Sequence, residues 1–388
     1  MRVRSSALGV VVALALAAPA PAATVRAFAL PAGYAVEPES EMPAIGLDAH
    51  GNVVALARQT GMHWAVRAFR WTSDGVRSAF APLPLRSIAH QQTPDALERV
   101  AIGPNGETYV TVGLELEELG GTPYEVERWT ESGAAVWDPP SCPGAEPDER
   151  DQHVGAIDAL GRVALTLDVT GPGSMEVLDD TTGALAPFAY VIEGERCAPL
   201  GRATVEALRG RYAAGYRGYL DGHLAPDNLN TIRQQYVAVR WTDGVLGELG
   251  PGVAYAVTSG GLVVGADALP GHVGTEVISG GGATERNSWA TPHAVAWDAS
   301  GAQIVLVAQA RRSVAYDVAD DGTVVGMLQE QDGKRYAFRW RHGRAQRLDD
   351  LPHPPEWRFA CAYAIASDGT IAGIGTYRGV PTAFTWRS

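Results

Sequence analysis

The chain has 388 residues, 46% of them hydrophobic, which is enough for a large core and excludes a disordered chain. Its formal net charge of −13 opposes binding to nucleic acids and to anionic membranes, because both are polyanions. Glycine (45 residues) and proline (25) are spread along the chain, which is typical of short strands joined by many turns.

Residues 1–23 have the pattern of a secretory signal peptide. "MRVRSS" is positively charged, and "ALGVVVALALAA" is an apolar run of 12 residues, too short to span a bilayer. The small residues of "PAPAA" offer a cleavage site after Ala22 or Ala23. No later stretch is apolar over about 18 residues. We therefore expect residues 24–388 to be exported, to the periplasm or the medium, without a membrane span.

One hairpin pattern recurs near the C-terminus. "AYAVTSGGLVVGA" (254–266), "AYDVADDGTVVGM" (315–327) and "AYAIASDGTIAGI" (362–374) each place a turn glycine between apolar segments, and each precedes "AVAW", "AFRW" or "AFTW". Asp-Gly and Gly-Gly between apolar runs favour tight hairpins. "AFRW" also occurs at 68–71, where its alternation predicts a half-buried strand with Phe69 and Trp71 on one side.

The same register runs through the whole chain. The turn glycines are Gly51, Gly106, Gly161, Gly210, Gly261, Gly322 and Gly369. Their average spacing of about 53 residues is the size of a four-stranded propeller blade. We predict an all-β fold, a seven-bladed β-propeller of four-stranded blades, with six or eight blades as the alternatives.

The repeats fall roughly at 42–84, 98–141, 152–200, 201–250, 251–310, 311–355 and 358–388. In the third repeat, either "MEVLDDTTGALAPFAYV" or "FAYVIEGERCAPL" holds the third and fourth strands. The last repeat has no fourth strand after Trp386, whereas "TVRAFALP" at 24–31 is similar to the fourth strand "VRSAFAPLP" of the first repeat. We expect residues 24–31 to complete the last blade and close the ring, which removes two exposed sheet edges.

The three cysteines indicate at most one disulfide within the chain. Cys142 and Cys197 flank the outer strands of neighbouring repeats, so a bond between them is possible in an oxidising compartment. Cys361 lies in the apolar segment "FACAYAIA" and is expected to be a buried free thiol. No Cys/His spacing indicates a metal site, and no cofactor is expected.

The hairpins "DDGTVVG…YAFRW", "SDGTIAG…TAFTW", "SGGLVVG…HAVAW" and "AHGNVVA…RAFRW" resemble those of bacterial exported HAF-repeat proteins. Those proteins carry a His-Ala-Phe strand after an "N-x-x-G-x-V-V-G" hairpin. The resemblance covers four repeats well and three loosely. The leading histidine survives only as His293, and Arg67, Tyr336 and Thr382 replace it elsewhere. The resemblance implies an exported, β-propeller-like protein and implies no catalytic activity.

Two long segments, 215–235 and 267–293, join the second and third strands of adjacent repeats and are predicted to be loops. Long loops on rigid scaffolds commonly carry function. Aromatic rings beside carboxylates and imidazoles suit sugar or peptide binding. The candidate ligand-binding residues are Tyr216, Tyr219, His223, Asp227, His272, Glu285, Arg286, Trp289 and His293. The alternative interpretation is a pair of solvated, variable loops.

The sequence contains no G-x-S-x-G elbow, HExxH, P-loop or dinucleotide fingerprint, so the catalytic residues of any reaction are unknown. We expect a monomeric, exported β-propeller that acts as a binding or interaction module for a glycan or a protein. The alternatives are a polysaccharide lyase or hydrolase with its site on the loop face, and a purely structural ring.

Overall fold

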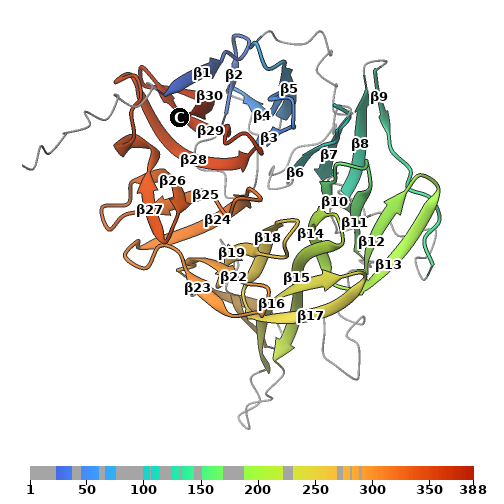
Figure 1. Ribbon diagram of the computed structural model, residues 1–388. Helices are drawn as coiled ribbons and strands as arrows, with labels where there is room; N and C mark the ends of the chain where they lie inside the picture. The colour runs from blue at the N-terminus through green and yellow to red at the C-terminus, as the bar shows by residue number, and fades with distance from the viewer. Residues whose placement is uncertain are drawn as a thin grey trace, which may run out of the picture.

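The computed structural model describes residues 23–36, 45–60, 66–75, 99–104, 106–113, 124–130, 133–143, 151–168, 188–221, 230–268, 274–279, 282–287 and 291–388. Within these residues the strands form seven sheets around a central axis (Figure 1). The fold is therefore the predicted seven-bladed β-propeller, and the six- and eight-bladed alternatives are wrong. No helix among the described residues is long and apolar enough to cross a membrane.

We number the blades in chain order. Blade 1 contains β2 (Tyr34–Ala35), β3 (Ile45–Leu47), β4 (Val53–Gln59) and β5 (Val66–Trp71). Blade 2 contains β6 (Arg99–Ile102), β7 (Thr108–Gly113), β8 (Tyr124–Thr130) and β9 (Gly133–Val136). Blade 3 contains β10 (Asp151–Ile157), β11 (Val163–Asp168), β12 (Phe188–Glu193) and β13 (Arg196–Arg202). Blade 4 contains β14 (Thr204–Arg209), β15 (Tyr212–Asp221), β16 (Asn230–Thr242) and β17 (Val245–Pro251).

Blade 5 contains β18 (Val253–Val257), β19 (Val263–Ala266), β22 (Ala294–Trp297) and β23 (Gln303–Val305). Blade 6 contains β24 (Arg312–Val318), β25 (Val324–Gln329), β26 (Arg335–Arg341) and β27 (Arg344–Arg347), followed by the 3-10 turn η2 (Leu348–Asp350). Blade 7 contains β28 (Trp357–Ile365), β29 (Ile371–Tyr377) and β30 (Val380–Arg387) together with β1 (Thr24–Phe28).

The turns between the first and second strands of the blades follow the predicted glycines. All seven glycines have a positive φ, between 61° and 84°, which residues other than glycine rarely adopt. Asp48 holds the first of these turns, because its Oδ1 accepts the backbone N–H groups of His50 and Asn52, each at 2.8 Å. Asp158 does the same in blade 3. These turns lie on one side of the ring, which we call the turn face.

The tryptophan that ends the third strand packs between blades. Trp71, Trp129, Trp241, Trp297 and Trp386 are each 3% exposed or less. Phe69 and Trp71 are buried in the same cluster with ring centroids 6.2 Å apart, so the predicted alternation of "AFRW" is confirmed. Five of the seven blades bury a tryptophan at this position, whereas blade 3 has Ile192 there and Trp340 of blade 6 is half-buried. The burial of a large aromatic ring in most blades explains why the aromatic strand recurs.

The ring closes as predicted. β1 runs antiparallel to β30, with Thr24 opposite Arg387 and Phe28 opposite Ala383 (Figure 1). Phe28 is 1% exposed, and its ring centroid lies 5.6 Å from that of Trp71 in blade 1. The N-terminal strand therefore joins the last blade and also seals its boundary with the first.

In blade 3, "FAYVIEGERCAPL" forms the third and fourth strands, β12 and β13, which selects the second of the two alternatives left open by the sequence. Cys142, which follows blade 2, forms a disulfide with Cys197 of β13, and their Cα atoms are 5.2 Å apart. Cys361 is a buried free thiol, as expected. The predicted fourth strand of blade 1, after Trp71, and residues 1–22 of the predicted signal peptide lie outside the described residues.

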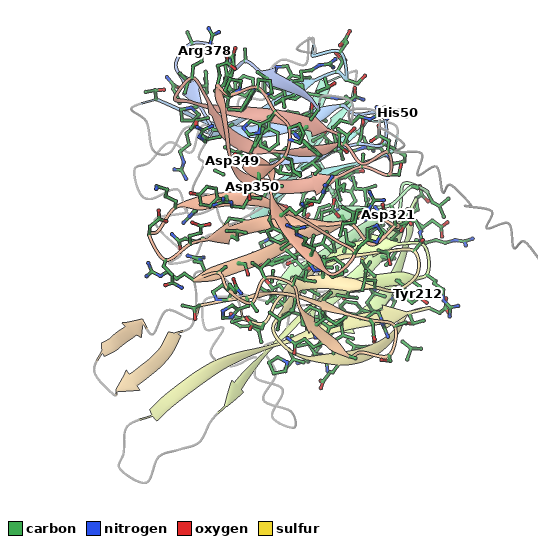
Figure 2. All side chains as sticks on the ribbon, turned by 60° about the vertical axis from the view of Figure 1, so that its left-hand side comes forward. His50, Tyr212, Asp321, Asp349, Asp350 and Arg378 are labelled. Carbon is green, nitrogen blue, oxygen red and sulfur yellow. A yellow bond between two sulfur atoms is a disulfide. The ribbon has the colours of Figure 1, made fainter. Side chains whose placement is uncertain are left out.

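The prediction that 215–235 and 267–293 are loops is wrong over much of their length. β15 and β16 continue their pairing out to Asp221 and Arg233, and a hairpin of β20 (Gly274–Ser279) and β21 (Gly282–Asn287) adds to β16. The four strands project from the ring on the side opposite His50, Tyr212 and Asp321 (Figure 2). The extensions of the two adjacent blades pair with each other. This pairing gives hydrogen-bond partners to backbone groups that a single extension would leave unpaired.

Candidate functional site

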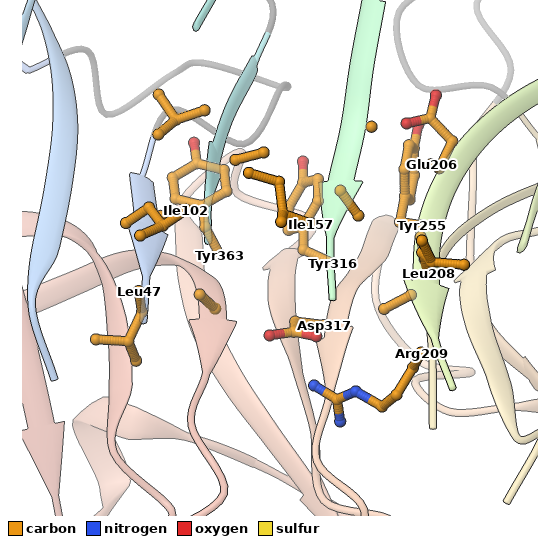
Figure 3. Close-up of a pocket in the computed structure, with 18 of the residues that line it drawn as sticks. Leu47, Ile102, Ile157, Glu206, Leu208, Arg209, Tyr255, Tyr316, Asp317 and Tyr363 are labelled. Carbon is orange, nitrogen blue, oxygen red and sulfur yellow. The ribbon is translucent and has the colours of Figure 1, made fainter. Parts of the chain in front are cut away.

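The inner strands of the seven blades surround a cavity of about 190 Å³ in the central channel (Figure 3). Its wall has two chemically different halves. Blades 1 to 3 contribute aliphatic side chains, among them Leu47, Ile102 and Ile157. Blades 4 to 7 contribute Glu206, Tyr255, Tyr316, Asp317 and Tyr363. The cavity can therefore hold a molecule that has an apolar face and several polar groups.

Bulges in the inner strands direct the polar side chains into the cavity. The register between the first and second strands shifts in blades 4, 5, 6 and 7 at Glu206, Tyr255, Tyr316 and Tyr363, and blade 7 has a further shift at Ala360. A bulge leaves one residue outside the ladder and turns its side chain away from the regular alternation. Blade 3 has the same bulge at Gly155, where a Cβ would lie 2.1 Å from the Val205 oxygen of blade 4.

A glycine in the second strand accommodates each of the three tyrosine-bearing bulges. A Cβ added at Gly265, Gly326 or Gly373 would lie 1.9 to 2.1 Å from a carbonyl oxygen of the first strand, far inside van der Waals contact. These are the glycines that end "VVG" and "IAG", four residues after the turn glycine. Blades 1 and 2 have Ala55 and Val110 there, and their first strands pair with no shift of register.

The three tyrosines form a continuous ridge across blades 5, 6 and 7. The ring centroids of Tyr255 and Tyr316 are 5.9 Å apart, and those of Tyr316 and Tyr363 are 5.1 Å apart. Burial raises the pKa of Tyr363 well above its usual value, so its phenol keeps its proton near neutral pH. The hydroxyls of Tyr316 and Tyr363 point toward the same end of the cavity as the Glu206 carboxylate (Figure 3).

Asp317 and Arg209 lie toward the other end of the cavity (Figure 3). The Asp317 carboxylate accepts N–H groups from Val318 and from Ile365 of blade 7, each at 2.8 Å. Burial raises the pKa of Asp317 to about 6, although these hydrogen bonds and the Arg209 charge act in the opposite direction. Arg209 also forms an ion pair of 3.3 Å with Asp320, so this end of the cavity joins blades 4 and 6.

The described residues among those proposed from the sequence do not line this cavity. Tyr216 is half-buried in β15, with its ring centroid 5.5 Å from that of Tyr236, and burial raises the pKa of Tyr236 to about 12. His293 faces Asp267, with 3.3 Å between Nδ1 and Oδ2. Tyr219 lies in β15, and Glu285 and Arg286 lie in β21, but only their backbone is described. His223, Asp227, His272 and Trp289 lie outside the described residues.

The sequence nevertheless contained a signal for the cavity. Tyr255, Tyr316 and Tyr363 each stand six residues before their turn glycine, in a repeated Ala-Tyr pair. Strand alternation in the sequence does not reveal the meaning of this pair. It shows neither where a bulge occurs nor that neighbouring blades bring the three rings together. Glu206 and Asp317 each occur once at such a position and leave no repeated pattern.

No protein-family model and no curated protein sequence matches the chain. The β-propeller domain of the Trilobed protease from Pyrococcus furiosus matches 90% of this chain and 94% of its own, with a TM-score of 0.50 and 10% identity. The acylaminoacyl peptidase of Pyrococcus horikoshii (TM-score 0.49, 11% identity) matches 92% of this chain but 51% of its own, and the polysaccharide lyase Uly1 (0.47, 9%) matches 90% of each. The likeness to the first of these, at 10% identity, supports the β-propeller fold and nothing finer.

Proposed function

We propose that the protein is an exported binding module that holds one ring of a neutral saccharide in its channel cavity. The observation that carries this proposal is the placement of Glu206, Tyr255, Tyr316 and Tyr363 at bulges, which brings a carboxylate and three phenols to one cavity. Phenols and carboxylates hydrogen-bond sugar hydroxyls, and aromatic or aliphatic walls cover the C–H faces of the ring.

The size and charge of the cavity favour this ligand class. A cavity of about 150 Å³ can hold one benzene molecule, so 190 Å³ has room for a single ring. The carboxylates of Glu206 and Asp317 disfavour an anionic ligand. Export is supported by the signal-peptide pattern of residues 1–23, by the HAF-repeat resemblance and by the Cys142–Cys197 disulfide, since disulfides persist in oxidising compartments.

Calorimetric titration of residues 24–388 with a panel of neutral monosaccharides and disaccharides tests the ligand class. Tyr316→Phe removes the central hydroxyl of the ridge and should weaken binding by about five- to tenfold, the value of one hydrogen bond. Tyr377→Phe is the matched control, because Tyr377 packs on Trp357 in blade 7, outside the cavity, and should leave the affinity unchanged.

Two results would overturn the proposal. One is an affinity of Tyr316→Phe equal to that of the unaltered chain. The other is the absence of any saccharide binding, or tighter binding of a quaternary ammonium compound, which would also suit aromatic rings beside a carboxylate. Fusion of residues 1–23 to an export reporter tests the exported location separately.

A further inference from the structure

A second and larger hollow lies between blades 3 and 4, away from the channel. Its volume is about 660 Å³, within the range of about 300–1,000 Å³ that is usual for ligand pockets. Its lining residues come from the first turn, β12 and β13 of blade 3, and from β14, β15, β16 and the turns after β14 and β16 in blade 4. We call it the blade 3–4 groove.

The floor of the groove is the apolar core between the two blades. Leu200, Leu208 and Trp241 line it, and all three belong to one packed cluster. Trp241 is fully buried, and its Nε1–H donates to the Leu200 oxygen at 2.8 Å. This hydrogen bond ties β13 to β16, so the floor is held in place before any ligand arrives.

The rim of the groove carries three arginines, Arg162, Arg196 and Arg211, and two carboxylates, those of Glu193 and Asp243. The guanidinium of Arg162 already has partners within the protein. It forms an ion pair with the buried Asp158 at 2.5 Å and also donates to the Gly210 oxygen of blade 4. Arg196 is exposed at the edge of β13. Apart from Arg162, the rim therefore carries two arginines and two carboxylates, on a chain whose net charge is −13.

Arg211 is both oriented and accessible. Its guanidinium carbon lies 5.6 Å from the centroid of the Tyr212 ring. That ring is packed against the turn of blade 5, where a Cβ at Gly261 would come within 2.9 Å of it. Arg211 forms an ion pair with Asp243, and both side chains are more than half exposed, at 56% and 61%. An exposed pair of this kind adds little stability, so a ligand carboxylate can exchange with Asp243.

We propose that the blade 3–4 groove binds a small organic acid, with its apolar body on the floor at Leu200 and its carboxylate at the Arg196 and Arg211 rim. Arginine suits this task because its planar fork of N–H groups matches a carboxylate. This site is separate from the proposed saccharide cavity, and neither proposal depends on the other.

Matched acids and amides test the proposal by calorimetry with residues 24–388. N-acetyl-phenylalanine should bind about tenfold more tightly than its carboxamide, which keeps the apolar body and lacks the charge. Acetate, which lacks the apolar body, should bind more weakly than the aromatic acid. Arg196→Gln and Arg211→Gln should each reduce the preference for the acid, whereas Arg344→Gln, at an exposed site on blade 6, should keep it.

Asp243→Asn separates the proposal from simple loss of structure, because it should strengthen binding of the acid by releasing Arg211. Equal affinity for acid and amide, or weaker acid binding by Asp243→Asn, would overturn the proposal. No detectable acid binding at millimolar concentration would do the same. Tyr316→Phe should leave acid binding unchanged, and a loss there would place the acid in the channel instead.

Discussion

At the scale of single residues, Asp317 is the half-buried group with the clearest energetic consequence. Its pKa is raised to about 6 from 3.8, chiefly by burial. Between these two values the folded chain keeps the proton that the unfolded chain has lost. The contribution of Asp317 to stability is therefore fully present below pH 3.8 and is lost as the pH rises through 6. Two pH units correspond to about 3 kcal/mol.

Chemical denaturation at several pH values tests this effect. The free energy of unfolding of the unaltered chain, minus that of Asp317→Asn, should fall by about 2 to 2.5 kcal/mol between pH 4 and pH 7 and then stay level. Asp321→Asn is a control of opposite sign. Although slight burial raises the pKa of Asp321, the Thr323 N–H bond and the Arg341 charge lower it overall. If the difference in the free energy of unfolding between the unaltered chain and Asp317→Asn does not change with pH, the pKa of Asp317 is not raised by folding.

At the scale of strands, a second-strand glycine lies beside the bulge in blades 4 to 7 and leaves room for the first-strand carbonyl. At Gly326, a Cβ would lie 2.0 Å from the Val314 oxygen and 2.8 Å from the Phe338 ring. Gly326→Ala should therefore reduce the free energy of unfolding by about 2 to 3 kcal/mol, as expected for overpacking in a rigid core. Gly247→Ala in β17 is the matched control, because its Cβ would meet only the Arg240 oxygen at 3.7 Å.

Denaturant melts of the two glycine variants make the comparison direct. A loss at Gly326 no larger than that at Gly247 would mean that the inner strand can move away from the added methyl group. In that case the bulge, and the position of Tyr316 that depends on it, would be adaptable rather than imposed by the glycine.

Strand prediction from the sequence succeeded where a hairpin repeats and failed where an element occurs once. Alternation and turn glycines predicted the blades, because burial between neighbours imposes the same pattern each time. The hairpin β20–β21 has no counterpart in other blades, and its pairing with β16 joins segments more than 40 residues apart. The channel site was missed for a related reason, since single residues such as Glu206 gain their role only from the ring.

At the scale of the whole molecule, the ring depends on a strand contributed from the opposite end of the chain. β1 supplies five paired residues to β30, and Phe28 is buried against Trp71. Removing residues 24–31 would expose the edge of β30. Loss of the buried Phe28 side chain alone would reduce the free energy of unfolding by about 2 to 3 kcal/mol. The melting temperature should fall by about 5 to 10 °C, measured by circular dichroism.

A permutation distinguishes closure from a local effect of deletion. Thr24 lies opposite Arg387, so residues 24–31 can be attached after Ser388 through a short glycine-rich turn, with the chain starting at residue 32. In this arrangement β30 and β1 form a continuous hairpin with the same register, and the melting temperature should recover. Closure then acts through pairing and burial, whichever terminus carries the strand. A permuted chain as unstable as the deletion, or a deletion that melts like the unaltered chain, would contradict this account.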